Sequence, residues 1–290
     1  MGGLVFGCIA PHGGLVIPEL GGADGVKALK TRAAMEELGR RLAAARPETL
    51  VLVTPHGARV DDTFSLLASG RVAGRLGTNG RSVSVAFGVD NALNEAIGVA
   101  AADLGVPVSR VVQGAPGNPL SCLPLDWGAV VPFWFMGRTL VPPPRVVVAC
   151  PDRRLDLAQF PRFGAAVRQA AEALGRRVAF IASADLGHAH DPAGPYGYDP
   201  ASAEFDAATV AAVKANDLGR LLSFDREWVA RAKPDALWQI LNLHGALDGT
   251  DLRGDFLSYE VPTYFGMMCA AYEKAEVREG RRMKDELVGS

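Results

Sequence analysis

Cysteine is scarce in this chain, and no hydrophobic run is long enough to span a bilayer. The four cysteines in 290 residues are widely spaced and form no CxxC pair, which favours a reduced, cytoplasmic protein. The N-terminal apolar run has no basic segment before it and is broken by Pro11 and His12, so we expect no signal peptide. No apolar stretch reaches the roughly 18 residues of a membrane helix, so we expect no membrane partner.

An excess of charge of either sign is also missing. The net charge is −2, which gives no reason to expect nucleic acid or an anionic membrane as a partner. Hydrophobic residues make up 49% and charged residues 21%, as in ordinary globular proteins. We expect a single domain over residues 1–272, followed by a charged C-terminal tail over residues 273–290.

Predicted strands alternate with predicted helices along most of the chain. The expected strands are residues 4–10, 50–54, 64–68, 82–87, 106–112, 146–150, 178–183 and 256–265. The expected helices cover about 25–45, 91–104, 159–175 and much of 201–247. This alternation predicts an α/β fold with a mixed central β-sheet flanked by helices on both faces.

Two of the five histidines occur in the same local setting, an apolar run followed by Pro-His-Gly. His12 follows the run at residues 4–10, and His56 follows the run at residues 50–54. Proline and glycine end a strand, so each histidine comes just after the carboxyl end of a predicted buried strand. Ligands of open α/β sheets bind at that edge, and imidazole is a common ligand of catalytic metals. Either histidine alone could bond only to loop backbone, but the duplicated setting favours a metal site.

A third apolar run, residues 178–183, leads directly into a segment that contains His188 and His190. Their spacing of two residues in extended chain predicts that one points inward and the other outward. Both are candidate catalytic residues. The alternative is an exposed turn, but the Pro, Gly and Tyr residues that follow favour the wall of a pocket.

A carboxylate is needed to complete such a site, and two candidates are present. Asp235 follows Pro234 at the expected start of a helix, where an acid could also serve the helix dipole alone. Glu260 lies in an aromatic-rich predicted strand. Two histidines and one carboxylate form the facial triad of non-haem Fe(II) oxygenases, which leaves coordination positions open. A further set of aromatic residues is expected to line the substrate pocket: Trp127, Tyr196, Tyr198 and Tyr264.

Taken in order, these segments resemble the class III extradiol dioxygenases of the protocatechuate 4,5-dioxygenase β-subunit type. The similarity covers roughly residues 4–272 and includes the segments GHAHDPAGPYGYDP and LSYEVPTYFGM, and an acid before the GAL at residues 245–247. The resemblance implies that His12 and His56 ligate iron, that Asp235 rather than Glu260 is the carboxylate ligand, and that His188 is the acid/base.

Two positions depart from the family pattern. The family usually has Glu where this chain has Asp235. Many relatives have a histidine at the position of Trp127 and use it near the substrate or O2. A tryptophan cannot transfer a proton as that histidine can. The function implied is ring opening of a catechol-like or 2-aminophenol-like substrate by O2, with Fe(II) as cofactor. The alternatives are a Zn²⁺-dependent hydrolase or lyase, and a non-catalytic metal-binding protein of the related Memo type. A homodimer or a second subunit is left open as a partner.

Overall fold

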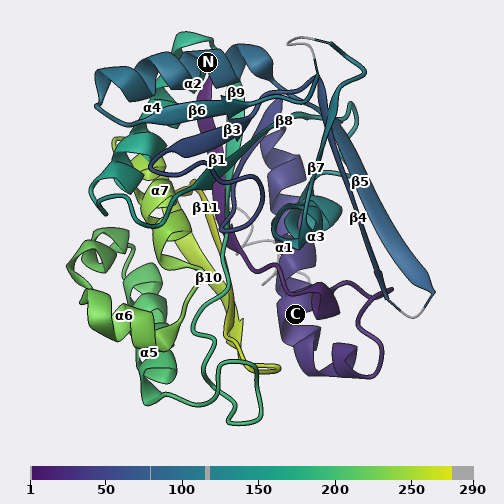
Figure 1. The fold of residues 1–290 in the computed structure, drawn as a ribbon, viewed down its shortest axis with the longest axis vertical. Coiled ribbons are helices and arrows are strands. Elements are labelled where there is room, and N and C mark those ends of the chain that lie inside the picture. Colours follow the sequence, from purple (N-terminus) through teal and green to yellow (C-terminus); the bar gives the residue numbers. More distant parts are fainter. Residues whose placement is uncertain (1, 79, 115–117, 276–290) are drawn as a thin grey trace, which may run out of the picture.

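The computed structural model describes residues 2–78, 80–114 and 118–275, and it has the expected mixed α/β architecture (Figure 1). Among these residues, eight strands form one mixed sheet in the order β10-β11-β1-β9-β2-β8-β3-β6. Its strands are β1 (Gly3–Ala10), β2 (Thr49–Val53), β3 (Phe64–Leu67), β6 (Val108–Val111), β8 (Arg145–Pro151), β9 (Arg177–Ser183), β10 (Leu252–Glu260) and β11 (Met267–Lys274). Strands β1, β9, β2 and β8 are parallel neighbours at its centre.

Helices cover both faces of this sheet, as predicted. One face carries α1 (Leu29–Ala45) and α3 (Trp127–Met136), and the other carries α2 (Asn91–Asp103), α4 (Gln159–Ala173) and α7 (Leu237–Leu247) (Figure 1). Two further helices, α5 (Pro200–Lys214) and α6 (Arg226–Ala232), lie beyond the edge of the latter group. Short 3-10 helices occupy Gly14–Val16, Asp24–Ala28 and Leu218–Ser223. No helix in the described ranges is long and apolar enough to cross a membrane.

Strand β2 shows why the central strands read as continuous apolar runs. Leu50 and Leu52 belong to the buried cluster on the side of α1 and α3, whereas Val51 and Val53 belong to the cluster on the side of α2, α4 and α7. Successive side chains of a strand point to opposite faces, so a strand covered on both faces must be apolar at every position.

Several elements differ from the sequence prediction. The expected strand at 256–265 is wrong in its bounds, because β10 ends at Glu260 and a separate strand, β11, extends to Lys274. The first two residues of the expected tail therefore belong to the sheet, and residues 276–290 lie outside the described part. A second sheet has the strand order β5 (Arg81–Gly88), β4 (Arg71–Thr78) and β7 (Cys122–Pro124). Of these three strands, the sequence predicted only β5.

Candidate metal centre

The sheet topology brings the loops after three parallel strands to one place. Strand β9 pairs with β1 on one side and with β2 on the other, and Ala10, the last residue of β1, lies opposite Ser183, the last residue of β9. His12 comes two residues after β1 and His56 three residues after β2. Both imidazoles therefore reach the carboxyl edge of the sheet, where open α/β sheets bind ligands.

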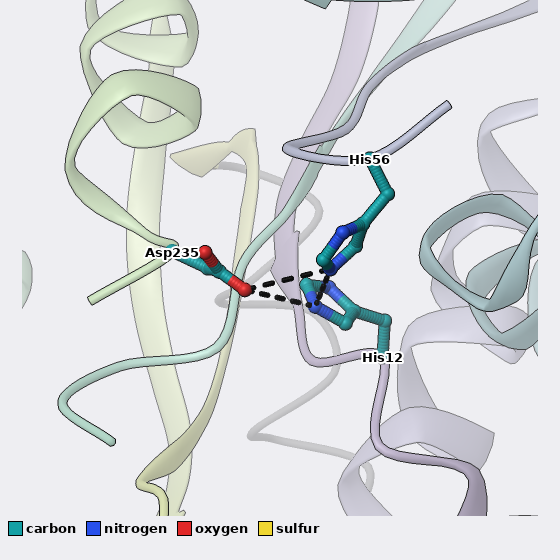
Figure 2. Close-up of side chains that lie close together, drawn as sticks. All are labelled: His12, His56 and Asp235. Carbon is teal, nitrogen blue, oxygen red and sulfur yellow. Dashed lines mark hydrogen bonds and ion pairs between the residues drawn. The ribbon is translucent and has the colours of Figure 1, made fainter. Parts of the chain in front are cut away.

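His12, His56 and Asp235 form a compact group of donor atoms at this edge (Figure 2). The Nε2 atoms of the two histidines are 3.2 Å apart. Asp235 Oδ2 lies 3.4 Å from His56 Nε2 and 3.8 Å from His12 Nε2. Ligands bound about 2.1 Å from one ion lie roughly 3 to 3.5 Å from each other. The donor set and its spacing therefore fit a divalent transition metal held by two histidines and one carboxylate.

Asp235 lies before helix α7 rather than in its first turn. The helix starts at Leu237, and the backbone N–H of Asp235 donates to the carbonyl of Asp185 at 3.0 Å. The side chain does not cap the helix; the Arg153 guanidinium donates to Oδ1, which leaves Oδ2 directed at the two histidines. The helix-dipole explanation of this acid is therefore wrong, and its oxygens are divided between an arginine and the histidine pair.

His12 is held in one orientation by buried partners. Its Nδ1 lies 3.0 Å from Ser183 Oγ, and that hydroxyl donates its own proton to the Gly128 carbonyl. Nδ1 must then carry the hydrogen and donate to Ser183, so neutral His12 has its lone pair on Nε2, the atom that faces Asp235. Asp185 accepts the backbone N–H of His12 and also lies 3.2 Å from Nε2.

The charges in this group influence one another strongly. Burial alone would lower the pKa of His12, but the carboxylates of Asp185 and Asp235 outweigh it and raise the pKa. Burial opposes ionisation of Asp235 too, yet the two neighbouring histidines and the charge of Arg153 hold its pKa well below the usual range. Burial raises the pKa of Asp185. Asp235 is therefore an anionic donor, as a metal ligand must be.

His56 has more exposed surroundings. Its side chain is 23% exposed, compared with 2% for His12. Among the residues that the structure describes, Asp235 is its one carboxylate partner within 4 Å. The ring of Trp127 packs against it with centroids 4.4 Å apart. Trp127 is itself 48% exposed and lines the cavity at the centre, as the sequence predicted for a pocket residue.

His188 also reaches the centre, without joining the close donor group. Its Nδ1 lies 2.8 Å from the Leu186 carbonyl, which can only accept, so Nδ1 carries the hydrogen and Nε2 the lone pair. That Nε2 is 3.8 Å from Asp235 Oδ2. The Phe265 ring stacks on the imidazole with centroids 5.2 Å apart and fixes its plane. His188 therefore presents a proton-accepting nitrogen beside the candidate metal ligands.

His190 points away from the centre into a separate network. Its Nε2 lies 2.9 Å from Asp206 Oδ2, which also accepts the Tyr259 hydroxyl at 2.7 Å. Asp206 Oδ1 accepts the backbone N–H of Gly187 at 2.7 Å. The expected inward and outward alternation is present, and the structure gives His190 a role in holding the loop rather than a place among the reacting groups.

Glu260, the second candidate ligand, does not approach the two histidines. Its Oε1 accepts hydrogen bonds from the backbone N–H and the hydroxyl of Thr31, at 2.7 and 2.6 Å. The carboxylate therefore ties β10 to helix α1. Of the two candidates, the structure brings Asp235 to the histidines and Glu260 to the opposite layer.

A cavity of about 350 Å³ opens over the donor group. Tyr196 and Tyr264 line it together with Trp127 and Phe265, so its walls are aromatic on several sides. Tyr198 does not line this cavity and is 63% exposed, so its predicted place in the pocket is wrong. An open donor set beneath an aromatic cavity can bind a small aromatic molecule close to a metal.

Comparison with known families agrees with this geometry. The family model of the catalytic LigB subunit of aromatic ring-opening dioxygenase matches residues 7–269. The chain belongs to the LigB family. Membership covers the whole region that supplies the candidate metal centre, and it confirms the family resemblance inferred from the sequence motifs.

Two individual proteins are also similar to this chain. Protein CA_C1420 of Clostridium acetobutylicum is 28% identical over 253 residues, which cover 87% of this chain and 54% of that protein. The chain thus spans about half the length of this curated relative. The crystal structure of the Escherichia coli K12 protein JW3007 matches with a TM-score of 0.53 at 14% identity, over 92% of this chain and 99% of that chain. This second likeness concerns the fold alone.

Two residues of the centre were missed by sequence reasoning. Neither Asp185 nor Arg153 was among the candidate residues from the sequence. Asp185 follows β9 directly, so its position after a buried strand was a usable signal. Arg153 lies in the loop after β8, and nothing in its local sequence indicates that it contacts Asp235.

Proposed function

We propose that this protein is an Fe(II)-dependent extradiol dioxygenase that opens the ring of a catechol-like or 2-aminophenol-like substrate with O2. The main support is the spacing of His12, His56 and Asp235 at the floor of an aromatic cavity. Three protein donors leave coordination positions open for two adjacent ring heteroatoms and for O2. Bound Fe(II) would supply both the binding site for these molecules and the redox chemistry between them.

In this proposal His188 moves the substrate proton. The hydrogen bond from Nδ1 to the Leu186 carbonyl leaves the lone pair on Nε2, on the side of Asp235. A ring hydroxyl held above the donor group would give its proton to Nε2, and the imidazolium could return it later to an oxygen of the product. A positioned general base of this kind typically contributes about 10²- to 10⁴-fold in rate.

The remaining residues bind and orient. Tyr196 and Tyr264 offer ring faces to an aromatic substrate, with their centroids 6.1 Å apart. Phe265 keeps His188 in its plane, and Arg153 keeps Asp235 from rotating both oxygens toward the histidines. These contacts favour a planar substrate held edge-on to the donor group.

The test is anaerobic reconstitution with Fe(II), followed by admission of oxygen with a panel of catechols and 2-aminophenols. We expect oxygen uptake matched by the absorbance of a ring-opened product. His188→Ala should keep stoichiometric iron while turnover falls by at least about 100-fold. Tyr198→Phe, which removes an exposed hydroxyl outside the cavity, is the control and should retain activity. Loss of iron in His188→Ala would instead make His188 a ligand.

The same donor set also suits Zn²⁺ with a water nucleophile, which is the second candidate function. The contact between His56 and Trp127 is the observation in its favour, because an indole offers no second acid/base beside the substrate. This alternative predicts tight metal binding without oxygen uptake across the panel. That result would leave a hydrolytic or a non-catalytic metal protein on this fold.

A further inference from the structure

Two side chains of helix α5 hold the backbone on either side of His188. The N–H of Gly187, the residue before it, donates to Asp206 Oδ1 at 2.7 Å. The N–H of Ala189, the residue after it, donates to Ser202 Oγ at 2.9 Å. Both acceptors are fully buried. Helix α5 therefore bonds to the chain directly before and directly after the residue that the proposed function uses as its acid/base.

Ser202 and Asp206 are four residues apart, which places them on the same face of α5. Ser202 Oγ also donates to the carbonyl of Ala232, the last residue of α6, at 2.9 Å. The N–H of His188 itself donates to that same carbonyl at 3.0 Å. A Cβ at Gly187 would lie 2.8 Å from Ser202 Cβ, so the loop and the helix are in direct contact. Three successive backbone N–H groups, those of residues 187–189, are thus bonded to α5 and α6.

Asp206 is itself held by its second carboxylate oxygen. Oδ2 accepts the Tyr259 hydroxyl at 2.7 Å and lies 2.9 Å from His190 Nε2. Burial and the negative charge of Asp206 raise the pKa of Tyr259, so this hydroxyl keeps its proton and donates it. These partners fix the carboxylate and leave Oδ1 for the N–H of Gly187.

The place of the His188 imidazole depends on this backbone. The carbonyl that accepts from its Nδ1 belongs to Leu186, in the same loop, so the hydrogen bond persists only while the loop keeps its shape. A displacement of about 1 Å at a reacting group can cost about 100-fold in rate. Buried N–H groups need acceptors anywhere in a protein, but here one helix supplies them on both sides of a single histidine.

We propose that Ser202 and Asp206 are positioning residues for His188, and that together they keep its Nε2 lone pair directed at the donor group. This inference rests on the proposed function, because it treats His188 as the group that moves the substrate proton. Neither residue lines the cavity over the donor group or belongs to that group. Both act through the backbone.

The tautomer of His188 in the metal-free protein tests this without any turnover. Ring-nitrogen chemical shifts from ¹H–¹⁵N correlation spectra distinguish a hydrogen on Nδ1 from one on Nε2, under mildly alkaline conditions where the imidazole is neutral. The spectrum of His188→Ala assigns the signal. We expect the Nδ1 tautomer alone in the wild type and a mixture of both tautomers in Ser202→Ala and Asp206→Ala. A wild-type spectrum in both variants would overturn the inference.

Conservative variants should restore the wild-type spectrum. Asp206→Asn keeps an oxygen for the N–H of Gly187, and its NH₂ group can donate to Tyr259 and His190. We therefore expect the Nδ1 tautomer in this variant, and a mixture of tautomers there would contradict the proposed contact with Gly187. Ser202→Ala removes a single oxygen, so it decides the question even if Asp206→Ala does not fold.

Thr49→Val is the matched control for destabilisation. Thr49 is fully buried at the first residue of β2, the opposite edge of the sheet, and its hydroxyl donates to Asp90 Oδ2 at 2.6 Å. The variant therefore loses a buried hydrogen bond far from His188 and should keep the Nδ1 tautomer. A mixture of tautomers in Thr49→Val would show a general effect of destabilisation and contradict the proposal.

Turnover by the iron-loaded protein separates this inference from the proposed function. The substrate is the catechol of the panel that gives the fastest oxygen uptake. We expect Ser202→Ala to lower kcat by about tenfold to 100-fold, with iron content and KM within about twofold of the wild type. An unchanged kcat would overturn the positioning role and keep the dioxygenase. Mixed tautomers in the variants of a protein that takes up no oxygen would support the hold on His188 and contradict the dioxygenase.

Discussion

The two Pro-His-Gly segments have the same local sequence but different surroundings in the fold. His12 is enclosed by Ser183 and Asp185, which contact both of its ring nitrogens. His56 lies at the edge of the cavity beside Trp127. The glycines also differ, because Gly57 adopts φ 92°, whereas a Cβ at Gly13 would come within 2.3 Å of a methionine side chain.

The motif therefore determines where the imidazole leaves the strand, whereas neighbouring residues in the fold determine how firmly the imidazole is held. The partners of His12 come from the neighbouring strand, because β1 lies beside β9. Ser183 is the last residue of β9, and Asp185 lies two residues further along the chain. His56 receives its main contact from Trp127, the first residue of α3. We therefore expect His12 to serve as the rigid ligand and His56 as the more adaptable one.

Removing each histidine in turn gives the largest expected effect. His12→Ala and His56→Ala should both lower metal affinity by more than about 100-fold, since changes in the second shell alone cost about 10- to 100-fold. His12→Ala should also reduce the free energy of unfolding of the metal-free protein by about 1–3 kcal/mol, because it leaves buried polar groups without partners. Metal content after dialysis and urea unfolding measure the two effects.

His244→Ala is the matched control for this pair, because His244 lies on α7 and lines a different cavity. It should leave metal content unchanged. Equal unfolding free energies for His12→Ala and His56→Ala would show that burial does not distinguish the two ligands.

Asp185→Asn gives the next largest effect and acts beside His12 rather than beside His56. The amide oxygen can still accept the backbone N–H of His12, so the local fold should persist. Loss of the negative charge near Nε2 should weaken metal binding by about 10- to 100-fold, the range for second-shell partners of histidine ligands. Titration with Zn²⁺ and with Fe(II) measures it. An unchanged affinity would restrict Asp185 to a structural role.

The central strands could be predicted from sequence, because each is buried on both faces and reads as an apolar run. Residues 146–150 and 178–183 correspond closely to β8 and β9. Helix α3 was missed because it is buried all round and shows no amphipathic period. Strand β4 was missed for the opposite reason, since exposed positions and two glycines interrupt its pattern.

The candidate site was predictable where a residue follows a strand and unpredictable where contacts come from distant loops. His12, His56 and His188 follow three neighbouring strands, so topology alone brings them together. Asp235 needed the family resemblance to be preferred over Glu260. The contact between Arg153 and Asp235 joins positions 82 residues apart, and no local pattern encodes it.

The smallest expected effect concerns the contact that distinguishes His56 from His12. Trp127→Ala removes the ring that packs on His56 and should weaken metal binding by about twofold to tenfold, as expected for an aromatic contact worth about 0.5–1.5 kcal/mol. Trp127→Phe keeps a ring in place and should stay close to the wild-type affinity. If Trp127→Ala binds metal as tightly as the wild type, then the backbone of the Pro-His-Gly segment holds His56 without the ring. The backbone N–H of His56 donates to Thr54 Oγ1 at 3.2 Å. Each Pro-His-Gly segment would then position its histidine without help from an aromatic ring, and the Trp127 ring would act only in binding the substrate.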